Sequence, residues 1–214
     1  MSLTLYYHPL SSYCMKALIA LYETGTAFTP KLIDLGDAAS RAELTRIWPI
    51  GKFPVLRDES RDSTIPESSI IIEYLAEHYP GRATLLPKEP GVVRQIRTRD
   101  RFFDFYVMDQ MSKIVTDKIR PPGMSDSYGV ERAREMLATA YGMIEQEIEG
   151  RAWFMGDDFT MADCAAAPAL FFASKVAPFG QHQNVAAYLD RLMNRPSFAR
   201  VLEEAKPYLA MFPG

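Results

Sequence analysis

The strand-like and helix-like segments of this chain separate near residue 80. Before that point, short β-type runs (LTLYYH, FTPKLIDL and FPVLRD) alternate with helical patterns, one of which places Cys14, Ala17, Leu18 and Leu21 on a single face. After it, helical periodicity covers residues 92–118, 130–149, 161–175, 183–194 and 197–206, and no strand-like alternation returns. This segregation predicts an α/β unit followed by an all-α unit.

The stretch YPGRATLLPKEPGV lies between the two units and is rich in proline and glycine. These residues do not continue a helix, so the stretch is interpreted as a linker. We therefore expect one domain over residues 1–80, a linker over 81–91 and an all-α domain over 92–214.

Composition narrows the classes of function. A net charge of -3 gives no general attraction to nucleic acid or to an anionic membrane. The N-terminal residues lack a basic region followed by an apolar one, and no run approaches the ~20 apolar residues that span a bilayer. The two cysteines, Cys14 and Cys164, indicate a reduced compartment rather than a disulfide framework. We expect a cytoplasmic protein without a metal site.

The first turn of interest is SSYC, residues 11–14, where a strand passes into a helix. Ser11 is a candidate N-cap, with Leu10 and Met15 as a hydrophobic staple, although Ser12 could take the cap instead. Cys14 lies on the apolar face of the helix, which predicts a buried and inert thiol.

Two further stretches contain a proline or serines at positions that suggest function. In WPIGKFPVLRD, Pro54 precedes a strand, where it is either an edge-strand proline or part of a cis bond at a tight turn. In ESSIIIEYL, Ser68 or Ser69 could cap a helix. Alternatively, the helix start and a serine hydroxyl bind a ligand carboxylate, while Glu67 accepts from a ligand ammonium group.

Taken in order, these stretches resemble the cytosolic glutathione transferases over essentially the whole chain. HPLSSYCMKALIAL is similar to the family's first strand and helix, and WPIGKFPVL to its cis-proline motif, with Trp48 in place of the usual Asn. ESSIIIEYL resembles the acid-serine pair, and FMGDDFTMADCAAAP the helical-domain motif in which Thr160 and Asp163 form a capping box. The resemblance implies a thioredoxin-like βαβαββα domain, an all-α domain and a homodimer.

The resemblance also assigns chemistry to the first turn. Glutaredoxins carry C-P-Y-C at the position of SSYC, so Ser11 replaces the nucleophilic cysteine. A hydroxyl cannot form a disulfide, but it can donate a hydrogen bond to the thiolate of bound glutathione. Ser11 is the preferred donor because it lies five residues before Lys16, as in serine-type members; Ser12 is the runner-up, and Tyr6 and Tyr7 remain alternatives.

The remaining contacts are implied motif by motif. The backbone of Phe53, positioned by Pro54, would pair with the cysteinyl part of glutathione, and Lys52 would bind its glycine carboxylate. Glu67 and Ser68 would bind the γ-glutamyl end, and Asp104 or Asp100 would reach the amine of glutathione in the neighbouring subunit. A second, electrophilic and hydrophobic substrate would lie against Tyr106, Met108 and Met111.

These implications favour a glutathione transferase of the serine type, with glutathione as co-substrate. A non-catalytic binding or stress-response protein on the same fold is the main alternative. A glutathione-dependent isomerase is a third, although SSYCMKA departs from the isomerase pattern.

Overall fold

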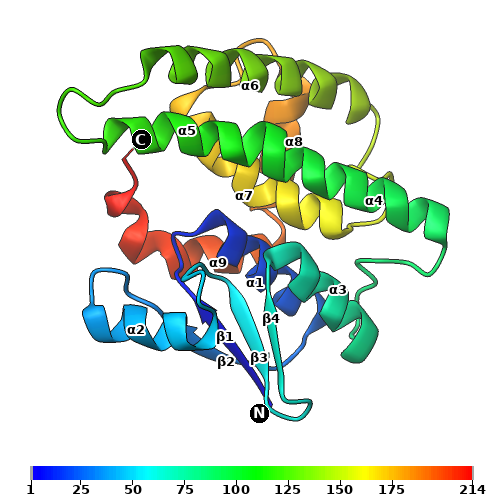
Figure 1. Cartoon of the computed structure of the whole chain (residues 1–214). Coiled ribbons are helices and arrows are strands. Elements are labelled where there is room, and N and C mark those ends of the chain that lie inside the picture. Colours follow the sequence, from blue (N-terminus) through cyan, green and yellow to red (C-terminus); the bar gives the residue numbers. More distant parts are fainter. Residues whose placement is uncertain (1, 214) are drawn as a thin grey trace.

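The computed structural model describes residues 2–213 and shows two stacked layers (Figure 1). The first layer contains all four strands and the first three helices, and the second contains only helices. The predicted α/β unit followed by an all-α region is therefore confirmed.

The sheet has the strand order β2-β1-β3-β4. Its strands are β1 (Leu3–Tyr7), β2 (Thr29–Leu32), β3 (Val55–Asp58) and β4 (Ser63–Pro66). β1 pairs with β2 in parallel and with β3 antiparallel, and β4 is antiparallel to β3. The apolar runs in the sequence mark β1, β2 and β3, whereas β4 was expected only from the βαβαββα order of the family.

Three helices accompany the sheet, namely α1 (Ser12–Thr24), α2 (Ala38–Ile47) and α3 (Ser68–His78). Every residue of α1 from Cys14 to Leu21 is buried, including those outside the predicted apolar face. This burial arises because α1 packs on α3 and also on α7 (Met161–Val176) and α9 (Pro196–Ala205) of the helical layer. The helix ends at Gly25, whose φ of 73° is the left-handed conformation that favours glycine.

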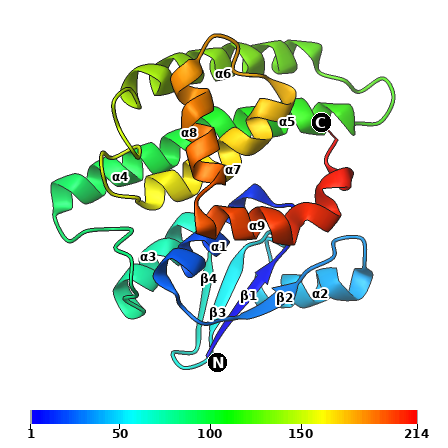
Figure 2. The ribbon, with the colours of Figure 1, turned by 180° about the vertical axis from the view of Figure 1, so that it is seen from behind.

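The helical layer begins with one nearly continuous rod. It consists of α4 (Pro90–Phe102), the π-helical segment η1 (Phe103–Met108) and α5 (Asp109–Lys118). The layer is completed by α6 (Ser127–Glu147), α7, α8 (Gln183–Met193), α9 and the 3-10 segment η2 (Lys206–Met211). Figure 2 shows the same arrangement from behind, with α9 between α7 and the sheet layer. Among residues 2–213, no helix is both long and apolar enough to cross a membrane.

The start of α7 is fixed by the predicted capping box. The Thr160 hydroxyl accepts from the first turn, and the Asp163 carboxylate accepts from the Thr160 amide at 2.9 Å. Asp163 also accepts from the Phe154 amide at 2.8 Å and from the Tyr188 hydroxyl at 2.6 Å. Because α7 packs against α1, this network fixes the surface on which α1 rests.

Candidate functional site

A cavity of about 180 Å³ lies where the segment before β3 meets the starts of α1 and α3. Its lining residues are Tyr13, Trp48, Lys52, Phe53, Pro54, Glu67 and Ser68. The sequence predicts five of these as ligand-binding residues, and they come from two segments separated by β3 and β4. The fold thus brings these five predicted residues together in one place, whereas Ser11 and Asp104 do not line the cavity.

The wall before β3 is formed by Phe53 and Pro54. The peptide bond between them is cis, so the second of the two interpretations left open by the sequence is the correct one. Pro54 is buried, and the Phe53 ring is stacked on His8, with ring centroids 6.2 Å apart. Lys52 is exposed at the edge of the cavity, where its ammonium group is available to an anion.

The opposite wall begins at Glu67, which has a φ of 69°. Such a conformation costs a non-glycine residue on the order of 1–3 kcal/mol, and it is found preferentially at functional sites. Glu67 is the N-cap of α3 and makes no side-chain cap hydrogen bond. Of the two interpretations that the sequence leaves open, capping by Ser68 or Ser69 is therefore excluded, because both already lie inside the first turn of α3.

The start of α3 can receive a negative charge. Its first N–H groups have no side-chain cap, and free N–H groups at a helix start favour anions. Ser68 is only 4% exposed, lines the cavity, and makes no side-chain hydrogen bond within residues 2–213. Glu67 and Ser68 thus place an acceptor and a donor side by side.

The turn before α1 has the capping geometry expected for Ser11. Its Oγ accepts from the Cys14 amide at 3.3 Å, which leaves the hydroxyl hydrogen free to be donated. Ser12 instead borders a narrow gap that it shares with Pro168 and Ala169 of α7. Cys14 is fully buried, and burial raises the pKa of its thiol to about 12, as expected for an inert cysteine.

A buried ionic cluster joins α1 and α3 to α4 and η1 of the helical layer. The Lys16 ammonium is 2.6 Å from Asp100 Oδ1 and 2.8 Å from Asp104 Oδ2, and it donates to Ser69 Oγ at 2.8 Å. Ser69 in turn donates to Asp100 Oδ2 at 2.7 Å. Burial raises the pKa of Asp104, while the Lys16 charge opposes that rise. The structure places Asp104 in this cluster and not in the wall of the cavity; its contact with a neighbouring subunit's ligand stays a prediction.

Comparison with known proteins identifies the family. Residues 5–83 match the sequence profile of the glutathione S-transferase N-terminal domain, and residues 127–191 match that of the C-terminal domain. The chain belongs to the glutathione S-transferase family. A curated relative, the stringent starvation protein A homologue of Coxiella burnetii, is 28% identical over 99% of this chain and 97% of its own.

Solved structures of family members contain glutathione or glutathione sulfonate. A glutathione S-transferase of Methylobacillus flagellatus, crystallised with glutathione, has a TM-score of 0.85 at 26% identity and covers 94% of this chain and 98% of its own. One from Methylobacterium radiotolerans, in complex with glutathione sulfonate, has a TM-score of 0.81 at 28% identity and covers 93% of each chain.

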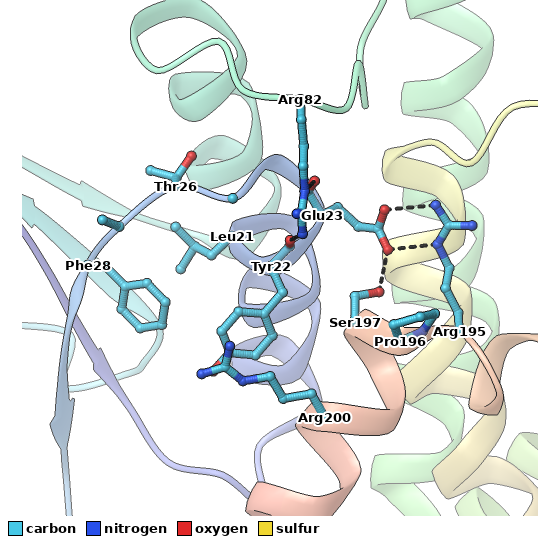
Figure 3. Close-up of a pocket in the computed structure, with 12 residues that line it drawn as sticks. Leu21, Tyr22, Glu23, Thr26, Phe28, Arg82, Arg195, Pro196, Ser197 and Arg200 are labelled. Atoms are coloured by element: carbon cyan, nitrogen blue, oxygen red, sulfur yellow. Dashed lines mark hydrogen bonds and ion pairs between the residues drawn. The ribbon is translucent and has the colours of Figure 1, made fainter.

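A larger cavity, of about 680 Å³, lies elsewhere and contains none of the predicted site residues (Figure 3). It lies where the end of α1 meets the linker and the start of α9. Each of the three arginines that line it contacts α1. Arg195 pairs with Glu23, Arg82 donates to the Tyr22 carbonyl, and Arg200 stacks on the Tyr22 ring. These contacts join the two layers, so we do not assign this cavity to the glutathione chemistry of the family.

Sequence reasoning missed two residues of the smaller cavity and misplaced two others. Trp48 lines the cavity, and its departure from the family's usual Asn was the available signal. Tyr13 also lines it, and nothing in the sequence indicates which side of α1 faces a ligand. Met108 and Met111, expected to contact a second substrate, are core residues at 2% and 5% exposure, whereas Tyr106 is exposed.

Proposed function

We propose that this protein is a glutathione transferase, which binds and ionises glutathione for attack on an electrophilic, hydrophobic small molecule. The observation that carries the proposal is the convergence on one cavity of Lys52, Phe53, Pro54, Glu67 and Ser68. Glutathione is zwitterionic at its γ-glutamyl end and anionic at its glycine end. The cavity offers matching partners at both of its ends.

Each end of the ligand has a partner of suitable chemistry. Glu67 accepts from the γ-glutamyl ammonium group, and Ser68 with the N–H groups of α3 binds the adjacent carboxylate. The backbone of Phe53 pairs with the cysteinyl unit, and Lys52 binds the glycine carboxylate. These contacts hold the thiol near the start of α1.

Ser11 then acts on the thiol. A free thiol has a pKa of about 8.5, and stabilising the thiolate by one pKa unit requires about 1.4 kcal/mol. A hydrogen bond to a charged acceptor provides about 1.5–3 kcal/mol, and the N-terminus of α1 adds to it. The thiolate attacks the electrophile, a carbon–sulfur bond forms, and the leaving group departs. The protein itself makes no covalent bond.

Titration calorimetry and a conjugation assay test this proposal together. We expect glutathione to bind at millimolar concentration or below, and 1-chloro-2,4-dinitrobenzene to be converted to its glutathione conjugate. A calorimetric titration that shows no heat of binding would contradict glutathione binding and therefore the proposal.

Binding without turnover is the expected outcome for a second candidate, a non-catalytic glutathione-binding protein. Two observations favour it. The Coxiella relative carries the name of a stringent starvation protein and not of a transferase. In addition, the gap between Ser12, Tyr13 and Met108 is too small to hold even a water molecule, so a second substrate does not enter there. A panel of electrophiles of different size, assayed under conditions in which glutathione is bound, separates the two candidates.

We also propose that the protein is a cytoplasmic homodimer. Large apolar side chains are exposed on α3 and η1, namely Ile70 at 43%, Phe105 at 55% and Tyr106 at 47%. Exposed apolar groups of this size are typical of surfaces that a partner covers. Light scattering that returns a mass of 24.2 kDa, that of one chain, would contradict the dimer.

A further inference from the structure

Of the four side chains in the SSYC turn, Tyr13 is the one that reaches the cavity. Ser11 caps α1, Ser12 faces α7, and Cys14 is enclosed in the core. Tyr13 stands on the first turn of α1, where it lines the cavity together with Glu67 and Ser68 and borders a second, small gap together with Asp104. Its side chain therefore lies where the two layers meet.

The Tyr13 hydroxyl is available to a ligand. The side chain is half-buried, and its hydroxyl makes no hydrogen bond within residues 2–213. Burial, followed by the negative charges of Asp104, Asp109, Glu67 and Asp100, raises the pKa of this phenol well above its usual value. The group thus remains a neutral donor at any physiological pH.

A bound γ-glutamyl group would need such a donor. Its carboxylate lies, under the proposed function, beside Ser68 and the start of α3, while the cationic side chain that lines the cavity, Lys52, serves the other end of the ligand. Glu67 next to it accepts hydrogen bonds and cannot stabilise an anion. Tyr13 lines the same cavity and offers an uncharged donor that has no hydrogen-bond partner among residues 2–213.

On the basis of the proposed function, we infer that Tyr13 is a glutathione-binding residue whose hydroxyl donates a hydrogen bond to the γ-glutamyl carboxylate. It acts on binding and orientation, whereas Ser11 acts on the thiol. In this assignment the SSYC turn contacts glutathione at two places. Ser11 lies at the thiol sulfur and Tyr13 at the γ-glutamyl carboxylate.

The test compares two ligands in two proteins. Tyr13→Phe retains the ring and removes only the hydroxyl, and cysteinylglycine lacks the γ-glutamyl group. We expect Tyr13→Phe to weaken glutathione binding by roughly ten- to fiftyfold, the loss for one hydrogen bond to a charged acceptor, and to leave cysteinylglycine binding unchanged within twofold. Tyr128→Phe, at a 72% exposed tyrosine on α6, is the matched control and should change neither affinity.

Each other outcome overturns a specific statement. Unchanged glutathione affinity in Tyr13→Phe refutes the inference and leaves the proposed function intact. An equal loss for both ligands refutes the assignment to the γ-glutamyl carboxylate. A pH–rate profile of Tyr13→Phe whose lower limb moves toward the free-thiol pKa would make Tyr13 the thiol donor and refute the present role. Failure of the unmodified protein to bind glutathione removes the proposed function, and the inference with it.

Discussion

The carboxylate of Glu23 accepts two hydrogen bonds from the Arg195 guanidinium, from Nε and from a terminal nitrogen, each 2.7 Å long. Glu23 lies at the end of α1 and Arg195 directly before α9, so the pair joins the two layers of the molecule (Figure 3). Ser197 donates to the same carboxylate. The pair is partly shielded, with side-chain exposures of 10% and 25%, which distinguishes it from the solvated ion pairs on the outer helices.

Removing this charge should destabilise the protein. Glu23→Gln retains the shape but weakens three hydrogen bonds, and we expect the free energy of unfolding to fall by about 1–3 kcal/mol. Urea unfolding followed by circular dichroism measures the change. Glu203→Gln is the control because its pair with Lys206 is about 70% exposed on both sides, and its effect should stay below about 0.5 kcal/mol. Equal midpoints for both variants would contradict the role assigned to Glu23.

The same pair predicts a pH dependence. Burial alone would raise the pKa of Glu23, but the hydrogen bonds from Arg195 and Ser197 and the Arg195 charge hold it below its ordinary value. A lowered carboxyl pKa contributes stability above the unfolded-state pKa of ~4.3, and this contribution is lost as pH falls through the folded-state pKa. The stability difference between the unmodified protein and Glu23→Gln should therefore be constant from about pH 7 to 5 and shrink below about pH 4. A stability difference that grows as the pH falls would contradict this prediction.

The buried cluster around Lys16 makes a larger contribution. Lys16→Met removes the buried cation from Asp100 and Asp104, in a site that is almost closed to water, and leaves them only the half-exposed Arg101 as a positively charged partner. We expect a loss of about 3–5 kcal/mol, measured by chemical unfolding. Lys113→Met, in a pair with Asp109 that is about half-exposed on both sides, should cost less than about 1 kcal/mol. A comparable loss of unfolding free energy at both lysines would mean that burial does not increase the contribution of the cluster to stability.

Strain at Glu67 predicts opposite effects on stability and binding. Glu67→Gly relieves the positive φ and should raise the free energy of unfolding by about 1 kcal/mol, while removing the partner of the γ-glutamyl ammonium group. Glu67→Gln keeps the strained backbone, so it should lose glutathione affinity without gaining stability. Thermal unfolding and calorimetry on the two variants separate the backbone effect from the charge effect. The strain argument fails if Glu67→Gly is the less stable protein.

Ser11 is tested by its effect on the thiol. Ser11→Ala should lower the conjugation rate at pH 7 by roughly ten- to a hundredfold, and the loss should shrink at alkaline pH, where solvent ionises the thiol without help. Ser11→Thr keeps both the hydroxyl and the cap and should retain most activity, and Cys14→Ser should do the same. If Ser11→Ala keeps full activity while Ser12→Ala or Tyr7→Phe loses it, Ser11 is not the donor to the thiolate. The residue whose substitution abolishes activity then has that role.

The sequence was sufficient where a local pattern determines local structure. Apolar periodicity predicted the helices of the second layer to within a few residues, and the spacing of Thr160 and Asp163 predicted their capping box. It was insufficient where packing decides. Met108 is buried because η1, the segment that contains it, packs against α7, and Ser68 and Ser69 are excluded from the cap because Glu67 takes the N-cap position of α3. The direction of Tyr13 depends on how α1 is rotated between α3 and α7, which no pattern within α1 reveals.

The burial of α1 on all sides limits how members of this family can be recombined. The helix belongs by chain order to the sheet layer, yet it completes the core of the helical layer through α7 and α9. A chimera joined in the linker would therefore combine an α1 from one parent with an α7 and α9 from the other. Such a chimera should fold only if the surface of α1 that faces the helical layer is exchanged together with the C-terminal half.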